Sequence, residues 1–162
     1  MKPGSIYLRL LSVFVLIVTI LSSCSRVDIE EYTAEGVSKL LATYRYETLG
    51  DVRYGLTFRI DTGKNTPVEG IAVIEFLRTA GREPLVLDFK VPGDYLKTVA
   101  VNGKPTEAGL VNGHIVIDRE LLSRRYNRIE VSFRAGDLSL NRNGEYLYTL
   151  FVPDRASTAF PC

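Results

Sequence analysis

The feature of this chain that most restricts its fold is a set of short segments in which apolar and polar residues alternate. The clearest runs from Val52 to Ile60, where the apolar side chains alternate with Arg53, Gly55, Thr57 and Arg59. Successive side chains of a β-strand point to opposite faces of the sheet. The pattern therefore predicts a strand with one buried face and one solvated face.

The same alternation returns in several further segments, which are separated by residues that favour turns. Asn102-Gly103 is a strong two-residue hairpin signal, because a type I′ turn needs two positive φ angles, and Asn112-Gly113 precedes a shorter strand. A series of about seven or eight short strands at this spacing predicts an all-β fold, a twisted antiparallel β-sandwich or saddle. The further strands are expected at Gly70–Phe76, Leu85–Lys90, Thr98–Val101, His114–Ile117, Ile129–Phe133 and Tyr146–Phe151.

One segment near the start of this region has the periodicity of a helix instead. Val37, Leu40, Leu41 and Tyr44 fall at i, i+3, i+4 and i+7, so they share one helix face. We therefore expect one short N-terminal helix, followed by strands, within a single domain that spans residues 35–162.

The start of the chain has the composition of an export signal. Its apolar run, Leu10–Leu21, is shorter than the roughly 20 residues that a membrane-spanning helix needs. Leu21-Ser22-Ser23-Cys24 resembles a bacterial lipobox, in which a signal peptide (residues 1–23) is removed and Cys24 is acylated. We therefore expect lipid attachment at Cys24, the membrane as a partner and a tether over residues 24–34. The alternatives are an uncleaved membrane anchor and a cysteine that lies near a signal by chance.

These features predict the location of the protein. An exported bacterial lipoprotein lies in the outer membrane or periplasm, or at the cell surface, and Ser25 does not resemble a signal for retention in the inner membrane. The net charge of +1, without a long run of lysine or arginine, predicts no nucleic-acid partner.

Residues that could carry catalysis are scarce. His114 is the one histidine of the sequence, whereas a zinc peptidase helix of the His-Glu-x-x-His type needs two. We expect His114 to be solvated or hydrogen-bonded rather than a metal ligand. The sequence predicts no catalytic residue, no metal and no cofactor on this chain.

Four other side chains have structural interpretations. Asp88 alternates away from its apolar neighbours, so we expect it in solvent or at a strand edge. Tyr146 and Tyr148 share one face of a predicted strand, and packing in the core is the favoured interpretation. If Cys24 is acylated, Cys162 has no disulfide partner. Its thiol then suits a hydrophobic pocket, or a partner, in sequence beyond this chain.

Several landmarks follow one another in an order that is moderately specific. They are Leu40–Arg45, Asp51–Phe58, Gly70 with Ile74 and Phe76, Leu85–Phe89, Val101–Gly103, Asn127 with Ile129 and Phe133, Tyr148-Thr149 and Phe160-Pro161-Cys162. Together they resemble the N-terminal β-domain of the aminopeptidase N family of zinc metallopeptidases, over most of the chain after the signal. In that family the Phe-Pro-Cys step is followed by the rest of the β-domain and by the catalytic domain, so we expect this chain to be cut short before them.

The resemblance implies a twisted β-domain that packs on a thermolysin-like catalytic domain, with zinc only in that second domain. Family members hold the free N-terminus of the peptide with a glutamine or glutamate. Those positions fall on Leu150 and Val152, whose side chains cannot accept a hydrogen bond from an ammonium group. The expected function is that of the non-catalytic N-terminal domain, or fragment, of an exported lipid-anchored zinc aminopeptidase, inactive as this chain alone. The alternatives are a self-standing surface lipoprotein that binds protein or glycan, and an unrelated sandwich that matches by chance.

Overall fold

A computed structural model of the chain describes residues 29–63, 65–79, 81–152 and 154–162. The predicted signal peptide, the predicted lipid-attachment residue Cys24 and residues 24–28 of the predicted tether lie outside the described residues. Among the residues that are described, no helix is long and apolar enough to cross a membrane.

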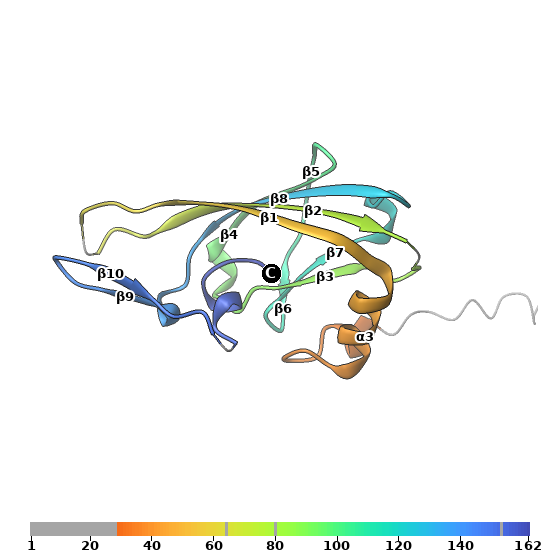
Figure 1. The fold of residues 1–162 in the computed structure, drawn as a ribbon, viewed down its shortest axis with the longest axis horizontal. Helices are drawn as coiled ribbons and strands as arrows, with labels where there is room; N and C mark the ends of the chain where they lie inside the picture. Colours follow the sequence, from red (N-terminus) through yellow and green to blue (C-terminus); the bar gives the residue numbers. More distant parts are fainter. Residues whose placement is uncertain (1–28, 64, 80, 153) are drawn as a thin grey trace, which may run out of the picture.

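A five-stranded antiparallel sheet forms one layer of the fold (Figure 1). Its strand order is β1-β2-β8-β4-β5, so β2 and β8 lie in its interior and β1 is an edge strand. The bounds of its strands are β1 Leu49–Arg59, β2 Glu69–Arg78, β4 Leu96–Val101, β5 Lys104–Thr106 and β8 Tyr126–Arg134.

A three-stranded antiparallel sheet, in the order β3-β7-β6, lies beneath the large sheet, and a separate hairpin pairs β10 with β9 (Figure 1). The strands are β3 Leu85–Asp88, β6 Leu110–Val111, β7 His114–Ile117, β9 Leu140–Arg142 and β10 Leu147–Thr149. Single 3₁₀ turns connect several strands: η1 Gly93–Tyr95, η2 Arg119–Leu121, η3 Asp137–Ser139 and η4 Ala156–Thr158.

The hairpin predicted at Asn102-Gly103 is confirmed, and the structure contains a second one at Asn112-Gly113 that was not predicted. Asn102 and Gly103 link β4 to β5 with φ angles of 52° and 79°. Asn112 and Gly113 link β6 to β7 with φ angles of 50° and 81°. Two consecutive positive φ angles are the requirement of a type I′ turn, which asparagine and glycine meet with little strain.

The hydrophobic core lies between the two sheets. The apolar faces predicted for Gly70–Phe76 and Ile129–Phe133 both point into it, in strands β2 and β8. Gly70 leaves room for the ring of Phe133, whose nearest atom would lie 2.5 Å from a Cβ at that position. Large buried side chains of this core include Ile74, Phe76, Leu85, Leu87, Phe89, Ile115, Ile117, Ile129, Val131 and Phe133.

Helix α3, Lys39–Thr48, covers the other face of the three-stranded sheet (Figure 1). Ser38 caps its first turn, because its hydroxyl oxygen accepts a hydrogen bond from the Leu41 N–H at 3.1 Å. Leu41 and Tyr44 form a second, smaller apolar cluster with Val86 of β3. The helical face predicted from the sequence is therefore the face that packs, except at its first position, Val37, which is 53% exposed.

Residues 29–34, which the sequence assigned to the tether, pack against the domain. The short helix α2, Ile29–Tyr32, buries Tyr32, whose ring meets that of Tyr44 edge to face at 5.6 Å between centroids. Asn112 Nδ2 donates a hydrogen bond to the Thr33 carbonyl at 3.0 Å. This segment therefore adds to the layer formed by α3.

The all-β antiparallel class predicted from the alternating pattern is confirmed, but the described residues form ten strands rather than seven or eight. The difference comes from β5, β6 and β9, which are two or three residues long. Alternation cannot be recognised over so few residues.

Strand β1 forms where alternation predicted it, yet the expectation that one face is buried is wrong over most of its length. Val52, Tyr54 and Leu56 are 48%, 43% and 38% exposed. The residues that build the core between the sheets come mainly from β2, β4 and β8 on one side and from β3 and β7 on the other. As an edge strand, β1 extends past this covered area, so its apolar face meets solvent.

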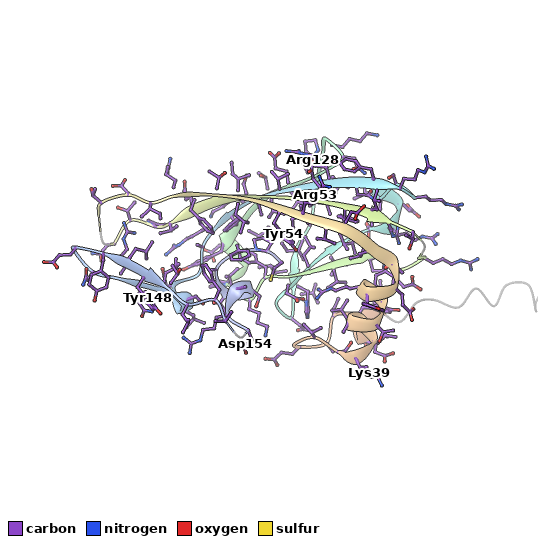
Figure 2. The ribbon with its side chains drawn as sticks, in the orientation of Figure 1. Lys39, Arg53, Tyr54, Arg128, Tyr148 and Asp154 are labelled. Atoms are coloured by element: carbon purple, nitrogen blue, oxygen red, sulfur yellow. The ribbon has the colours of Figure 1, made fainter. Side chains whose placement is uncertain are left out.

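The interpretation of Tyr146 and Tyr148 as core residues is also wrong. They are 60% and 56% exposed, at and beside β10, and Figure 2 shows Tyr148 on this hairpin. The hairpin contacts the β1–β2 connection through Arg142, which donates to the Thr66 carbonyl at 2.8 Å and to the Asp61 carbonyl. A two-stranded ribbon with no sheet over it leaves these rings in solvent.

Candidate functional site

An apolar pocket of about 320 Å³ lies where α3, β1, β2, β3 and the last residue of the chain meet. Because most of its lining residues are hydrophobic, the pocket suits an apolar group rather than an ion. We refer to it as the apolar pocket. It is lined by Arg45, Tyr46, Leu49, Val52, Tyr54, Ile74, Phe76, Leu85, Val86, Leu87 and Cys162.

A β-bulge at the start of β1 shapes one wall of the apolar pocket. Asp51 has a φ of 49°, and the register with β2 shifts between Gly50 and Arg53. Val52, within the bulge, and Tyr54, beyond it, both line the pocket. Figure 2 shows Tyr54 on the side of β1 that faces the domain interior, away from Arg53 on the outer face of the sheet.

The last residues of the chain form another wall and pair with β3. The Asp88 N–H donates to the Cys162 carbonyl at 2.6 Å, and the Cys162 N–H donates to the Asp88 carbonyl at 3.0 Å. Phe160 packs edge to face on Phe58 and Phe151, with centroids 6.2 Å and 5.3 Å apart. Figure 1 shows the C-terminus beneath the large sheet, beside β3. This backbone pairing places the Cys162 side chain in the pocket.

An ion cluster joins the pocket to the layer of α3. Both oxygens of Asp88 accept from Arg45, at 2.9 Å from Nη1 and 2.7 Å from Nη2. The Arg45 Nη2 also donates to the Val86 carbonyl at 2.7 Å. His114 Nδ1 lies 2.9 Å from Asp88 Oδ1, and its Nε2 lies 3.0 Å from the Ala34 carbonyl oxygen.

The expectation that Asp88 lies in solvent is wrong, because this residue is only 8% exposed, although it does belong to an edge strand, β3. Strand β3 has the core on one face and α3 on the other, so neither face meets water. A buried carboxylate is costly unless it has hydrogen-bond or ion-pair partners. Arg45 and His114 are those partners of Asp88. The expectation of a hydrogen-bonded His114 is confirmed, since this ring is fully buried between two oxygen acceptors.

Burial raises the pKa of the Cys162 thiol and of the Tyr54 phenol, two side chains that line the apolar pocket. Desolvation, and then the nearby Asp88 charge, raise the pKa of the Cys162 thiol to about 11. Desolvation is also the largest cause that raises the pKa of Tyr54 to about 12, followed by its neighbour Cys162. Tyr54 is 43% exposed because the wall of an open pocket remains accessible to solvent.

These shifts determine the chemistry available in the apolar pocket. A thiol with a raised pKa stays protonated near neutral pH, so Cys162 is a poor nucleophile. Tyr54 is likewise neutral, and the Arg45 cation is already paired with Asp88. The pocket can therefore hold an apolar group beside a thiol and a phenol, but it offers no activated nucleophile or base.

No group of three or more histidine, cysteine, aspartate or glutamate side chains in the described part of the chain could hold a metal ion. Both ring nitrogens of His114 already face oxygen atoms of the protein, so neither is free to coordinate. The residues described thus contain no arrangement suited to zinc.

The positions carried over from the aminopeptidase resemblance are not brought together with the apolar pocket. Leu150 and Val152 follow β10 and are 41% and 69% exposed, and neither lines the pocket. Sequence reasoning missed Arg45 and Tyr54 as site residues. Arg45 does follow Leu41 by four positions, so it lies beside the buried helix face, and that spacing could have indicated it.

The chain matches no protein-family model and no curated protein.

Proposed function

We propose that this chain is the non-catalytic N-terminal β-domain of an exported, lipid-anchored zinc aminopeptidase. The sequence landmarks described above support the family, and the antiparallel all-β architecture is compatible with it. The observation that carries the proposal is the apolar pocket. Cys162, the last residue of the Phe160-Pro161-Cys162 landmark, lines it, and the chemistry of the pocket suits packing rather than catalysis.

The exposed apolar face of β1 supports a packing role. Val52, Tyr54 and Leu56 alternate along this face and remain between 38% and 48% exposed. Adjacent large apolar side chains on a protein surface commonly mark a contact with another protein unit. In this proposal the unit is the catalytic domain of the same polypeptide, which holds the zinc and hydrolyses N-terminal residues from peptides.

Isolation of the native polypeptide tests the proposal. An antibody raised against residues 29–162 should capture a polypeptide well above 18.1 kDa from the source cells. The captured material should release N-terminal amino acids from peptides in a reaction that a zinc chelator stops. A polypeptide of 18.1 kDa or less without this activity would contradict the proposal.

The membrane anchor is the second part of this proposal. Acylation of Cys24 by several lipid chains would hold the protein firmly on a membrane, at about 0.8 kcal/mol for each buried methylene. Cells that express the full chain with a clickable fatty acid should label the wild type and not Cys24→Ser. The variant should also leave the membrane fraction. Equal labelling of both proteins would remove Cys24 as the attachment site.

A self-standing surface lipoprotein that binds protein or glycan is the second candidate. The specific observation in its favour is the exposure of Tyr46, Tyr146 and Tyr148, at 88%, 60% and 56%. Exposed tyrosines are common at binding surfaces because they combine a large apolar ring with a hydroxyl group. Saturable binding of a glycan array component, lost in Tyr146→Ala and Tyr148→Ala, would favour this candidate.

A further inference from the structure

A second pocket, of about 300 Å³, lies on the loop that follows β2 and has a different character. Its lining consists of Arg78, Thr79, Gly81, Arg82 and Arg124, with no acidic residue among them. Three arginines from two separate segments of the chain therefore line one depression. We refer to it as the arginine pocket.

Arg78 is the unusual member of the arginine pocket, because its side chain is buried and only 6% of the residue is exposed. Its Nη2 faces three neutral acceptors: the Glu83 carbonyl at 2.7 Å, the Gly81 carbonyl at 3.1 Å and the Tyr44 hydroxyl at 3.2 Å. Its Nε is buried and has no hydrogen-bond partner in the described part of the structure. The Nη2 atom of Arg78 thus has three acceptors within hydrogen-bond distance, whereas its Nε atom has none among the described residues.

A buried guanidinium is normally matched by a carboxylate or another anion. None of the ion pairs between described residues involves Arg78, Arg82 or Arg124. Glu83 is the acidic side chain next to the pocket in sequence, and its carboxylate accepts the Arg82 backbone N–H at 2.7 Å. That one negative charge leaves the three guanidinium groups in excess.

We propose that the arginine pocket binds a phosphate group, either free phosphate or the phosphate of a small organic molecule. A tetrahedral oxyanion offers several acceptor oxygens at once, and guanidinium groups bind such oxygens through paired, charge-assisted hydrogen bonds. The anion supplies the negative charge that the three arginines need. The role is distinct from that of the apolar pocket, whose Arg45 is already paired with Asp88.

Calorimetric titration of the folded chain with inorganic phosphate tests this site, at constant ionic strength set with chloride. Wild-type protein should bind phosphate saturably with one site per chain. Arg82→Gln and Arg124→Gln should each raise the Kd about tenfold, which corresponds to the loss of one charge-assisted contact. Both side chains are exposed, so these changes spare the core. Arg78 is left unchanged, because its bonds also hold the loop.

Arg53→Gln is the matched control, since Arg53 is an exposed arginine on the outer face of the large sheet (Figure 2). This variant should bind phosphate with the wild-type Kd. Glycerol 3-phosphate distinguishes the two sources of the group, since tighter binding than free phosphate assigns the site to a carried phosphate and equal binding assigns it to the free ion. Absence of saturable phosphate binding, or equal weakening in all three variants, would overturn the proposal.

Discussion

At the scale of residues, the best-defined feature is the contact between Arg45, Asp88 and His114. These side chains come from α3, β3 and β7, and they join the helical layer to the small sheet. Asp88 is a hydrogen-bond partner of both Arg45 and His114. Without these partners, each side chain would leave a charged or polar group unpaired in a buried or half-buried position.

Asp88→Asn tests this contact. The substitution removes the carboxylate charge and leaves Arg45 half-buried without its counter-ion, so the free energy of unfolding should fall by about 3 kcal/mol. Urea denaturation followed by circular dichroism measures the change. Glu69→Gln is the control, because it breaks the exposed Arg59–Glu69 pair and should cost less than about 0.5 kcal/mol. Equal losses in both variants would contradict the account.

The Cys162 thiol gives a pH-dependent prediction. Its pKa is raised from 9.0 to about 11, so the protonated thiol stabilises the fold fully below pH 9, and this contribution is lost as the pH rises to about 11. In a chain that begins at Ser25, Cys162 is the only cysteine. Iodoacetamide at pH 8 should alkylate the folded chain at least about tenfold more slowly than the urea-unfolded chain. Equal rates would show that the thiol is not shielded in the apolar pocket.

The residue-scale site could be predicted from the sequence only in part. The sequence predicted a solvated or hydrogen-bonded His114 from its place at a strand start after Asn112-Gly113. The place of Asp88 did not follow, because alternation shows that β3 has two faces but not that a helix covers the second one. Its partners Arg45 and His114 lie 43 and 26 residues away, and nothing local in the sequence links them.

At the scale of elements, interior strands and edge strands behave differently although their sequences look alike. Strand β2 alternates exposed and buried residues as expected, whereas β1 is exposed along most of its length. The alternation of apolar and polar residues predicted both segments as strands, because this two-residue period is that of the β-strand backbone. It could not predict which strand would lie at the edge, because strand order depends on pairing between distant segments.

A pair of substitutions measures this difference. Ile74→Ala in β2 removes a side chain that is 2% exposed and should lower the free energy of unfolding by about 3 kcal/mol. Leu56→Ala in β1 should cost less than about 1 kcal/mol, because this side chain is already partly in water. Thermal and urea unfolding check both values. A larger cost at Leu56 would mean that the face of β1 is covered in solution.

The C-terminal segment predicts a further steric effect. A Cβ at Gly136 would lie 2.1 Å from the Thr158 carbonyl oxygen, and backbone cannot move aside as a side chain tip can. Gly136→Ala should therefore lower the free energy of unfolding by about 3 kcal/mol and loosen the packing of η4. Gly93→Ala is the control, since no atom lies within 4 Å of its Cβ position. A near-neutral Gly136→Ala would contradict this packing.

At the scale of the whole molecule, two β-sheets and a helical layer leave an apolar pocket that the end of the chain helps to form. The Phe160-Pro161-Cys162 segment carries the family resemblance, and the structure shows it as part of the core and of the β3 pairing. Its role within this chain is therefore architectural. The all-β class could be predicted from the alternation and the turns, but the pocket could not, because it needs residues from three strands, one helix and Cys162.

The proposed function predicts, as its central point, that this domain has no peptidase activity of its own. The direct measurement uses a purified chain that begins at Ser25, incubated with zinc and leucine 4-nitroanilide, with release of 4-nitroaniline followed by absorbance. The account predicts the same rate as a blank without protein, with or without added zinc. Zinc-dependent release that a chelator abolishes would contradict it.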